Sequence, residues 1–254
     1  MSVVEAAAIL LAGVGAGTIN TVVGSGTLIT FPTLLAFGIP PVTANVSNNV
    51  GLVPGALSGT LAGRRELAGQ RRLVRALAPA SLVGGALGAV LLLVLPASAF
   101  AAIVPALIVL GVVLVVVQPR LSAWVARRHE AVGGLPPTGA WWVAPSVLLA
   151  GVYGGYFGAA QGVLLMAVLG NGVADSLNRL NATKNLLSTV VNGVAAAVFI
   201  LLEPIDWTVA GLIAAGSVVG GQVGARIGRR LPQPVLRGVI VVVGTVAVLA
   251  LLTT

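Results

Sequence analysis

Two short segments rich in asparagine interrupt an otherwise apolar chain, one in each half. The first reads Asn45-Val46-Ser47-Asn48-Asn49 and the second reads Asn181-Ala182-Thr183-Lys184-Asn185. Amide and hydroxyl groups donate hydrogen bonds without a fixed charge, and Lys184, the only lysine, adds a positive charge. Because polar groups at membrane depth are costly and usually functional, the duplicated segment predicts a site for a small anion between two repeats.

The spacing places the polar side chains of each segment on one helical face, since residues i, i+3 and i+4 lie together. In the second segment this face holds Asn181, Lys184 and Asn185 and continues to Ser188 and Asn192. If the segments also begin their helices, free backbone N–H groups and the helix dipole would add to the attraction for an anion. Two alternatives stay open: the asparagines can join neighbouring helices, and the lysine can extend from a helix end to lipid headgroups.

Glycine-rich interruptions supply the second group of candidate site residues. Gly24-Ser25-Gly26 lies in the first half and Gly158-Ala159-Ala160-Gln161-Gly162 in the second. Each precedes an apolar run that is too short for a comfortable crossing, so we interpret both as broken or re-entrant helices whose backbone can face a substrate. Close packing of helices on small residues is the alternative. The candidate contacts at the breaks are Ser25, Gly26, Gln161 and Gly162.

Membrane helices must position these residues. The chain is 57% hydrophobic and 8% charged, against about 25% charged residues in soluble domains. At about 20 apolar residues per crossing, it has room for roughly eight to ten transmembrane or re-entrant helices. We therefore expect an all-α polytopic membrane protein. The apolar runs cover about residues 3–23, 26–38, 42–63, 74–95, 98–117, 140–157, 160–173, 181–202, 207–227 and 235–252.

The similarity between the halves extends beyond the asparagine segments at a constant separation, that between Asn45 and Asn181, which we call the repeat offset. At this offset residues 81–96 align without a gap with residues 217–232, and 8 of the 16 positions are identical. This similarity predicts two homologous halves. The expected divisions are a first repeat over 1–117, a basic cytoplasmic linker over 118–139 and a second repeat over 140–254.

Charge placement predicts that the two halves have opposite orientations. The loop 64–75 carries five arginines and should be cytoplasmic, whereas its counterpart, 200–211, carries two acids and no basic residue. The next turn reverses this pattern, because 96–100 is uncharged and its counterpart contains Arg229 and Arg230. Equivalent loops then face opposite sides, which predicts an inverted-topology repeat. Both termini should lie outside a bacterial inner membrane that the chain crosses several times.

Several functional classes receive no support from the composition. There is no cysteine, and the single histidine, His129, lies beside arginines in the predicted linker. We therefore expect no metal site, no cofactor and no enzymatic chemistry. The net charge of +8 comes from arginines at the ends of apolar runs, which indicates topology rather than nucleic-acid binding. No basic region precedes the first apolar run, so no cleavable signal peptide is expected.

Two further groups of polar and aromatic residues are weaker candidates. Asp175 and Arg179 flank the second asparagine segment, where they either line an entrance or anchor a helix end. An interfacial aromatic belt is predicted from Trp141, Trp142, Tyr153 and Tyr156.

Three segments resemble the TauE/SafE-type sulfite exporters: 24–32 (GSGTLITFP), 45–51 (NVSNNVG) and 154–162 (GGYFGAAQG). The resemblance covers nearly the whole chain. It implies a bacterial inner-membrane carrier that exports sulfite, organosulfonates or related sulfur compounds and has no enzymatic activity. Many members carry an Ala-x-x-Thr-Ser type sequence at the two asparagine segments, so this chain looks like an asparagine/lysine-rich subgroup.

Three hypotheses for the function follow. The leading one is a secondary transporter that exports a small anion by alternating access, the anion being sulfite, an organosulfonate or another sulfur oxyanion. The second is a non-transporting membrane interaction protein in which asparagines specify helix packing. The third is an anion channel. The expected partners are the anion and the lipid bilayer, without nucleic acid, and a homodimer is an open alternative.

Overall fold

The computed structural model describes residues 1–129, 136, 138–227 and 233–253, and these residues form ten helices and no strand. The helices of the first half are α1 (Val3–Val22), α2 (Thr27–Ala36), α3 (Pro41–Ala62), α4 (Arg71–Val94) and α5 (Ala97–His129). Those of the second half are α6 (Val143–Tyr156), α7 (Gln161–Gly172), α8 (Leu177–Leu202), α9 (Trp207–Ile227) and α10 (Gln233–Thr253). Five of them, α1, α4, α5, α8 and α9, are long and apolar enough to cross a membrane. The prediction of an all-α polytopic membrane protein is confirmed.

Local sequence signals explain where several helices begin and end. At the start of α1, Ser2 Oγ accepts the Glu5 N–H at 3.2 Å, and the Glu5 carboxylate accepts the Ser2 N–H at 2.8 Å. This reciprocal pair satisfies two N–H groups that would otherwise be free at a helix start. Helix α3 begins at Pro41, whose fixed φ suits the first helical position. Helix α5 continues to His129, so it includes the first part of the predicted linker.

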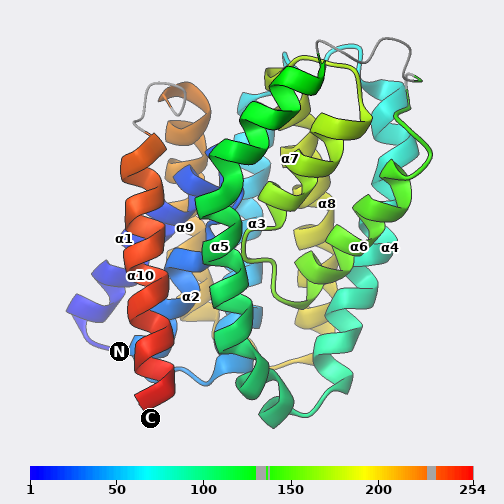
Figure 1. Ribbon diagram of the computed structural model, residues 1–254. Helices are drawn as coiled ribbons and strands as arrows, with labels where there is room; N and C mark the ends of the chain where they lie inside the picture. Colours follow the sequence, from blue (N-terminus) through cyan, green and yellow to red (C-terminus); the bar gives the residue numbers. More distant parts are fainter. Residues whose placement is uncertain (130–135, 137, 228–232, 254) are drawn as a thin grey trace.

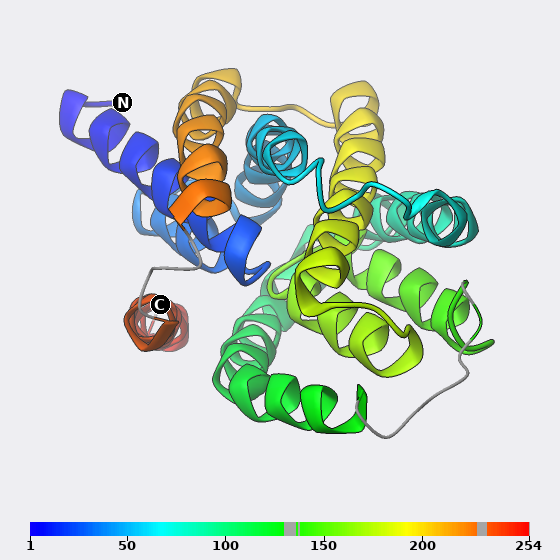
Figure 2. The ribbon, with the colours of Figure 1, turned by 90° about the horizontal axis from the view of Figure 1, so that it is seen from above.

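Corresponding helices of the two halves begin at positions related by the repeat offset: α3 at Pro41 and α8 at Leu177, α4 at Arg71 and α9 at Trp207, and α5 at Ala97 and α10 at Gln233. Each half also packs onto the other in an equivalent way. Helix α1 packs on α9, α6 packs on α4, and α3 meets α8 between these two pairs (Figure 2). These contacts are unchanged when each helix is exchanged for its counterpart, as expected for two homologous halves.

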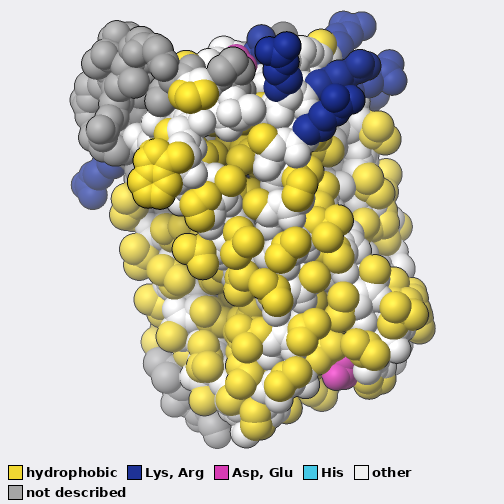
Figure 3. Space-filling view, turned by 90° about the vertical axis from the view of Figure 1, so that its right-hand side faces the viewer, with side chains coloured by type: hydrophobic (Ala, Val, Ile, Leu, Met, Phe, Trp, Pro, Cys, Tyr) yellow, Lys and Arg dark blue, Asp and Glu magenta, His cyan; other side chains and the backbone are white. Residues whose placement is uncertain are grey.

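Corresponding helices run in opposite directions. In Figure 1, α3 ascends and α8 descends, and α4 and α9 are reversed in the same way. Both termini lie at the lower end, and lysine and arginine side chains gather at the upper end on the face seen in Figure 3. We call the upper end the arginine-rich end, after Arg64 and Arg65 of the α3–α4 turn and Arg71, Arg72 and Arg75 at the start of α4. This arrangement is consistent with an inverted-topology repeat.

The short helices α2 and α7 each return towards the end of the bundle at which the preceding helix, α1 or α6, begins. Helix α2 has 10 residues and α7 has 12, which corresponds to about 15–18 Å, roughly half of an apolar bilayer core. The start of α6 lies beside the end of α7, where the Ala140 N–H donates to the Gly172 carbonyl at 2.8 Å. The α6–α7 hairpin therefore enters and leaves at the arginine-rich end, and α1–α2 is its counterpart from the opposite end (Figure 1).

Candidate functional site

The helix breaks of the two halves meet inside the bundle. The Gly162 N–H donates to the Gly24 carbonyl at 3.1 Å. A Cβ on Gly24 would lie 2.4 Å from the Gly162 Cα, and Gly24 also has a positive φ of 90°. Both requirements favour glycine, which has no Cβ and adopts positive φ readily. The two glycine-rich interruptions therefore form one junction between the halves.

A small polar cavity, here called the central cavity, lies beside this junction. Its volume of about 10 Å³ is room for about one water molecule. Its walls come from both halves, from the two breaks and from helices α3 and α8. The lining residues are Asn20, Gly24, Thr27, Asn49, Leu52, Phe157, Gly158, Gln161, Gly162, Ser188 and Asn192.

Three lining side chains have buried polar atoms without a hydrogen-bond partner among the described residues. They are Asn49 Oδ1, Gln161 Nε2 and Ser188 Oγ. A buried unpaired polar group costs about 1–3 kcal/mol, so three around one cavity need an explanation other than stability. Gly154 makes room for one of them, because a Cβ there would lie 2.3 Å from Gln161 Cδ. The cavity thus presents neutral donors and acceptors that the described part of the fold does not satisfy.

A larger cavity of about 710 Å³ opens at the arginine-rich end, and we call it the vestibule. Its mouth includes Arg64, Arg65 and Glu66 of the α3–α4 turn, and its inner part reaches Thr21 and Val22 at the end of α1. Asn178, Asn181 and Asn185 of α8 also line it. The vestibule therefore extends from the arginine-rich end towards the junction of the breaks.

One face of α8 connects the two cavities. Asn181 and Asn185 line the vestibule, and Ser188 and Asn192 line the central cavity. These residues follow spacings of four, three and four, so they form a continuous stripe along the helix, as their spacing in the sequence predicts. The structure adds that this stripe leads from a wide cavity to a narrow one.

Lys184 lies on α8 between Asn181 and Asn185, but it lines neither of the two cavities described. Its side chain is 1% exposed, and Nζ donates to the Thr21 carbonyl at 3.4 Å. Asn185 Nδ2 donates to the same oxygen at 3.3 Å. Thr21 belongs to the last turn of α1, where helix carbonyls carry partial negative charge that a cation stabilises. The alternative in which Lys184 extends to the headgroups is wrong, because its side chain is buried against the broken helix.

The remaining polar residues of the first asparagine segment bond to protein groups. Asn45 Nδ2 donates to the Tyr156 carbonyl at 2.9 Å, at the end of α6. Ser47 Oγ accepts the Asp206 N–H at 3.0 Å, and Asn48 exchanges hydrogen bonds with two threonines of α2. For these residues the helix-joining interpretation describes the observed contacts. Only Asn49 of this segment reaches the central cavity.

The expectation that the asparagine segments begin their helices is wrong. Helix α3 starts at Pro41 and α8 at Leu177, so Asn45 and Asn181 are each the fifth residue, beyond the free N–H groups of the first turn. In α7, which does begin at the break, the N–H groups of residues 161–164 all donate to backbone carbonyls. Side chains, rather than free helix ends, therefore provide the donors.

Two other candidates, Ser25 and Thr183, lie outside the central cavity. Both are fully buried, and their hydroxyl oxygens have no hydrogen-bond partner among the described residues. Gly26 lies directly before α2, and a Cβ there would come within 2.5 Å of the Ala16 carbonyl oxygen, so it serves close packing. Asn20 and Thr27 were not among the predicted contacts, although their polarity beside the first break was a usable signal.

An aromatic cluster lies under the central cavity, on the side away from the vestibule. Phe31, Phe100, Tyr156 and Phe157 meet edge to face, with ring centroids 5.1–6.4 Å apart. Tyr156 is therefore part of the interior and not of an interfacial belt. Trp141, which is 87% exposed, fits the predicted belt.

Some expectations fall on residues outside the described part of the chain. They concern the side chain of His129, residues 130–135 and 137 of the predicted linker, and Arg229 and Arg230. Within the described residues, no group of three or more His, Cys, Asp or Glu side chains could hold a metal ion.

Comparison with known proteins assigns the chain to a family. It is 27% identical to a probable membrane transporter protein, ORF9, of Sinorhizobium sp, over 93% of this chain and 88% of that protein. It is 27% identical to a probable membrane transporter protein of Haemophilus influenzae (91% and 88%), and 26% identical to the probable membrane transporter protein YfcA of Escherichia coli (91% and 83%). No solved structure matches the chain significantly. The family model for the sulfite exporter TauE/SafE matches residues 9–251, and the chain belongs to this family.

Proposed function

We propose that this membrane transporter exports a small anion, namely sulfite, an organosulfonate or another sulfur oxyanion, by alternating access. The observation that carries the proposal is the central cavity, where three side chains from α3, α7 and α8 have buried polar atoms that are unpaired within the described residues. Amide and hydroxyl donors from both halves can replace the water around an oxyanion without adding fixed charge. The family's transporters make transport, rather than catalysis, the expected activity.

The single lysine supplies the charge that selects an anion. Lys184 lies on α8, one residue before Asn185 and one turn before Ser188, and within the described residues it donates one long hydrogen bond, to the Thr21 carbonyl. An anion moving along the stripe offers this ammonium group a stronger, charge-assisted partner. In this proposal Lys184 turns from the α1 carbonyl to the anion as the substrate enters the central cavity.

One-sided access supports a carrier. The vestibule leads inward from the arginine-rich end, while the aromatic cluster and the hydrogen bond from Asn45 to the Tyr156 carbonyl lie on the other side of the central cavity. We take the arginine-rich end as cytoplasmic, because positive loops stay on that side of a bacterial inner membrane. The conformation is then inward-open, as required for a carrier that loads substrate for export, and both termini lie outside.

Two alternatives predict different behaviour. A channel needs a continuous polar path, whereas here an aromatic cluster interrupts the path beyond the cavity. Saturable counterflow of labelled anion in proteoliposomes would separate a carrier from a channel. A non-transporting interaction protein would use its asparagines for packing alone, so substitutions at the cavity would change stability without any response to an anion.

Sulfite flux into proteoliposomes tests the site. Lys184→Met keeps the length of the side chain and removes its charge, so we expect a loss of apparent affinity of tenfold or more. Lys184→Arg restores a cation and should retain measurable affinity. Thermal stabilisation of the purified protein by sulfite, sulfoacetate, thiosulfate and acetate gives a second reading, because a ligand of the folded state raises its stability.

Unchanged flux and affinity in Lys184→Met would remove Lys184 from the site. If no anion in the panel stabilised or crossed with the natural protein, the anion proposal itself would fail.

A further inference from the structure

One pair of equivalent positions in the two halves forms a contact at one end of the bundle only. At the repeat offset, Ser47 of α3 corresponds to Thr183 of α8, and Gln70, which precedes α4, corresponds to Asp206, which precedes α9. At the end opposite the arginines, Ser47 Oγ accepts the Asp206 N–H at 3.0 Å. At the arginine-rich end the corresponding contact, from the Gln70 N–H to Thr183, is not made, and Thr183 Oγ1 is buried without a partner among the described residues. The first contact closes α9 onto α3, and its counterpart would close α4 onto α8.

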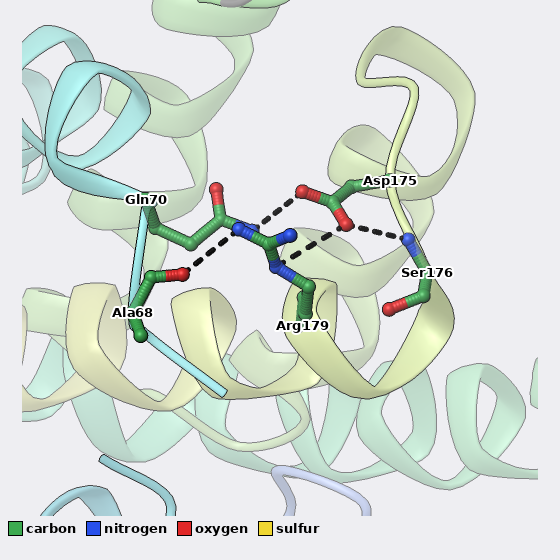
Figure 4. Close-up of polar contacts among 5 residues, drawn as sticks. All are labelled: Ala68, Gln70, Asp175, Ser176 and Arg179. Carbon is green, nitrogen blue, oxygen red and sulfur yellow. Dashed lines mark hydrogen bonds and ion pairs between the residues drawn. The ribbon is translucent and has the colours of Figure 1, made fainter. Parts of the chain in front are cut away.

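A different set of contacts holds Gln70 near the mouth of the vestibule. Its Nε2 donates to Asp175 Oδ2 at 2.6 Å (Figure 4). Its backbone N–H donates to the Leu67 carbonyl. Arg179 reinforces this position, because it donates to the Ala68 carbonyl at 2.9 Å and lies 3.4 Å from Asp175 Oδ1. These side chains join the α3–α4 turn of one half to the α7–α8 turn of the other.

Thr183 lies in a suitable position to replace these contacts. It is one turn beyond Arg179 on α8, about 5 Å deeper in the bundle. It also lies between Leu180 and Leu187, which belong to the same apolar cluster as Leu73 and Leu77 of α4. The first turns of α4 therefore already face the part of α8 that carries the unpaired hydroxyl.

The sequence also gives α4 a point at which it can bend. Pro79 lies inside α4 and cannot donate a backbone hydrogen bond to the preceding turn, so the helix is weakened there. The corresponding residue of α9 is Ala215, which has no such effect. Beyond Pro79, Gly84 and Gly85 pack closely on α6 and α8. The segment 71–78 can thus move while the rest of α4 stays packed.

We infer that the α3–α4 turn is the gate of the arginine-rich end, and that the Gln70 N–H and Thr183 Oγ1 form its latch in a second conformation. Closure bends α4 at Pro79 and releases the Gln70 side chain from Asp175. The Gln70 N–H then donates to Thr183 Oγ1 in place of the Leu67 carbonyl. The same movement carries Arg64, Arg65 and Glu66 over the vestibule that they line. At the opposite end, the Ser47–Asp206 bond opens. The inference rests on the proposed alternating access and names the residues that perform it at one end.

Paired cysteines test this gate directly, since the chain contains no cysteine of its own. Copper–phenanthroline oxidation of Gln70→Cys/Thr183→Cys should form a disulfide, which requires Cα atoms about 4.4–6.8 Å apart. Anion uptake should then fall more than tenfold and recover on reduction. Gln70→Cys/Asp175→Cys and Ser47→Cys/Asp206→Cys are the controls for the conformation described here, and linked peptides are identified by mass spectrometry.

Absence of the Gln70–Thr183 disulfide, when both control pairs link, would overturn the gate. If the disulfide forms in a protein that moves no anion, the gate stands and the proposed function fails, so the two failures are distinguishable.

A single substitution gives an independent reading. Thr183→Val removes a hydroxyl that is unpaired here, so the thermal stability of this conformation should stay unchanged or rise. The maximal rate of anion exchange should nevertheless fall severalfold with the apparent affinity unchanged, because the latch is lost, and Thr183→Ser should restore it. If the Thr183 hydroxyl instead stabilised the conformation described here, Thr183→Val would lower the thermal stability, and that result would contradict the latch.

Discussion

At the scale of single residues, the central cavity is unusual because three of its polar atoms are buried without a hydrogen-bond partner among the described residues. Asn49, Gln161 and Ser188 contribute nothing to stability through their unpaired atoms. Lys184 differs from them, since its ammonium group has a carbonyl partner at the end of α1. Substitutions at the neutral residues and at the lysine should therefore have different effects on stability.

Gln161→Met should weaken anion binding without weakening the fold. The thioether has nearly the length of the amide side chain, and it removes a buried unpaired donor, so thermal stability in detergent should stay unchanged or increase. The apparent affinity for the transported anion should fall about five- to tenfold. Both quantities can be measured on the same preparation, by a thermal-shift scan and by proteoliposome flux.

Asn171→Leu is the matched control on the same helix. Asn171 Nδ2 donates to the Ala167 carbonyl, and the residue does not line the central cavity. Its substitution should leave the anion affinity unchanged. Equal losses of affinity in both variants would argue against a specific role for Gln161.

At the scale of helices, the junction of the two breaks is the feature on which the site depends. Gly24 and Gly162 place the loop after α1 and the start of α7 in direct backbone contact. The same junction positions Gln161 and the end of α1, to which Lys184 donates. A change at the junction should therefore affect both stability and the site.

Gly24→Ala should destabilise the protein strongly. The alanine would be held at an unfavourable positive φ, at a cost of about 1–2 kcal/mol. Its Cβ would also collide with the Gly162 Cα. Gly38 separates the two effects, because it too has a positive φ of 77° but has nothing within 4 Å of an added Cβ. The apparent melting temperature of Gly24→Ala should fall clearly further than that of Gly38→Ala. Similar shifts in the two variants would mean that the backbone contact has little energetic weight.

At the scale of the whole molecule, charge is distributed unequally between the two ends. Among the described residues, the arginines of the α3–α4 turn lie at one end, while Glu203 and Asp206 of the α8–α9 turn lie at the other with both termini. Positive loops retained in the cytoplasm orient such a protein.

Single cysteines should report this orientation in intact cells. Ala68→Cys lies in the α3–α4 turn and Ser98→Cys at the start of α5, and both positions are exposed. A membrane-impermeant maleimide should label Ser98→Cys from outside and should label Ala68→Cys only after the cells are permeabilised. The reverse pattern would invert the topology and place the vestibule outside.

The sequence by itself determined the membrane class, the two halves and the polar face of α8, because hydropathy, internal identity and helical spacing are properties of neighbouring residues. The same signals placed Asn49, Gln161, Gly162 and Asn185 among the candidate site residues, and these four line the two cavities. They could not separate these from Asn45, Ser47 and Asn48, which carry the same chemistry but have partners on α6, α9 and α2.

Only the tertiary structure decided which polar groups are satisfied, because a hydrogen bond between residues 45 and 156 or 184 and 21 depends on how the halves pack. It also showed that the Lys184 ammonium group donates to a carbonyl at the end of α1 and lines neither of the two cavities described. Equivalent sequence positions can therefore have unequal contacts: Ser47 has a partner in Asp206, whereas its counterpart Thr183 has none among the described residues. That inequality, and not the repeat alone, distinguishes the end of the protein that holds the vestibule from the opposite end.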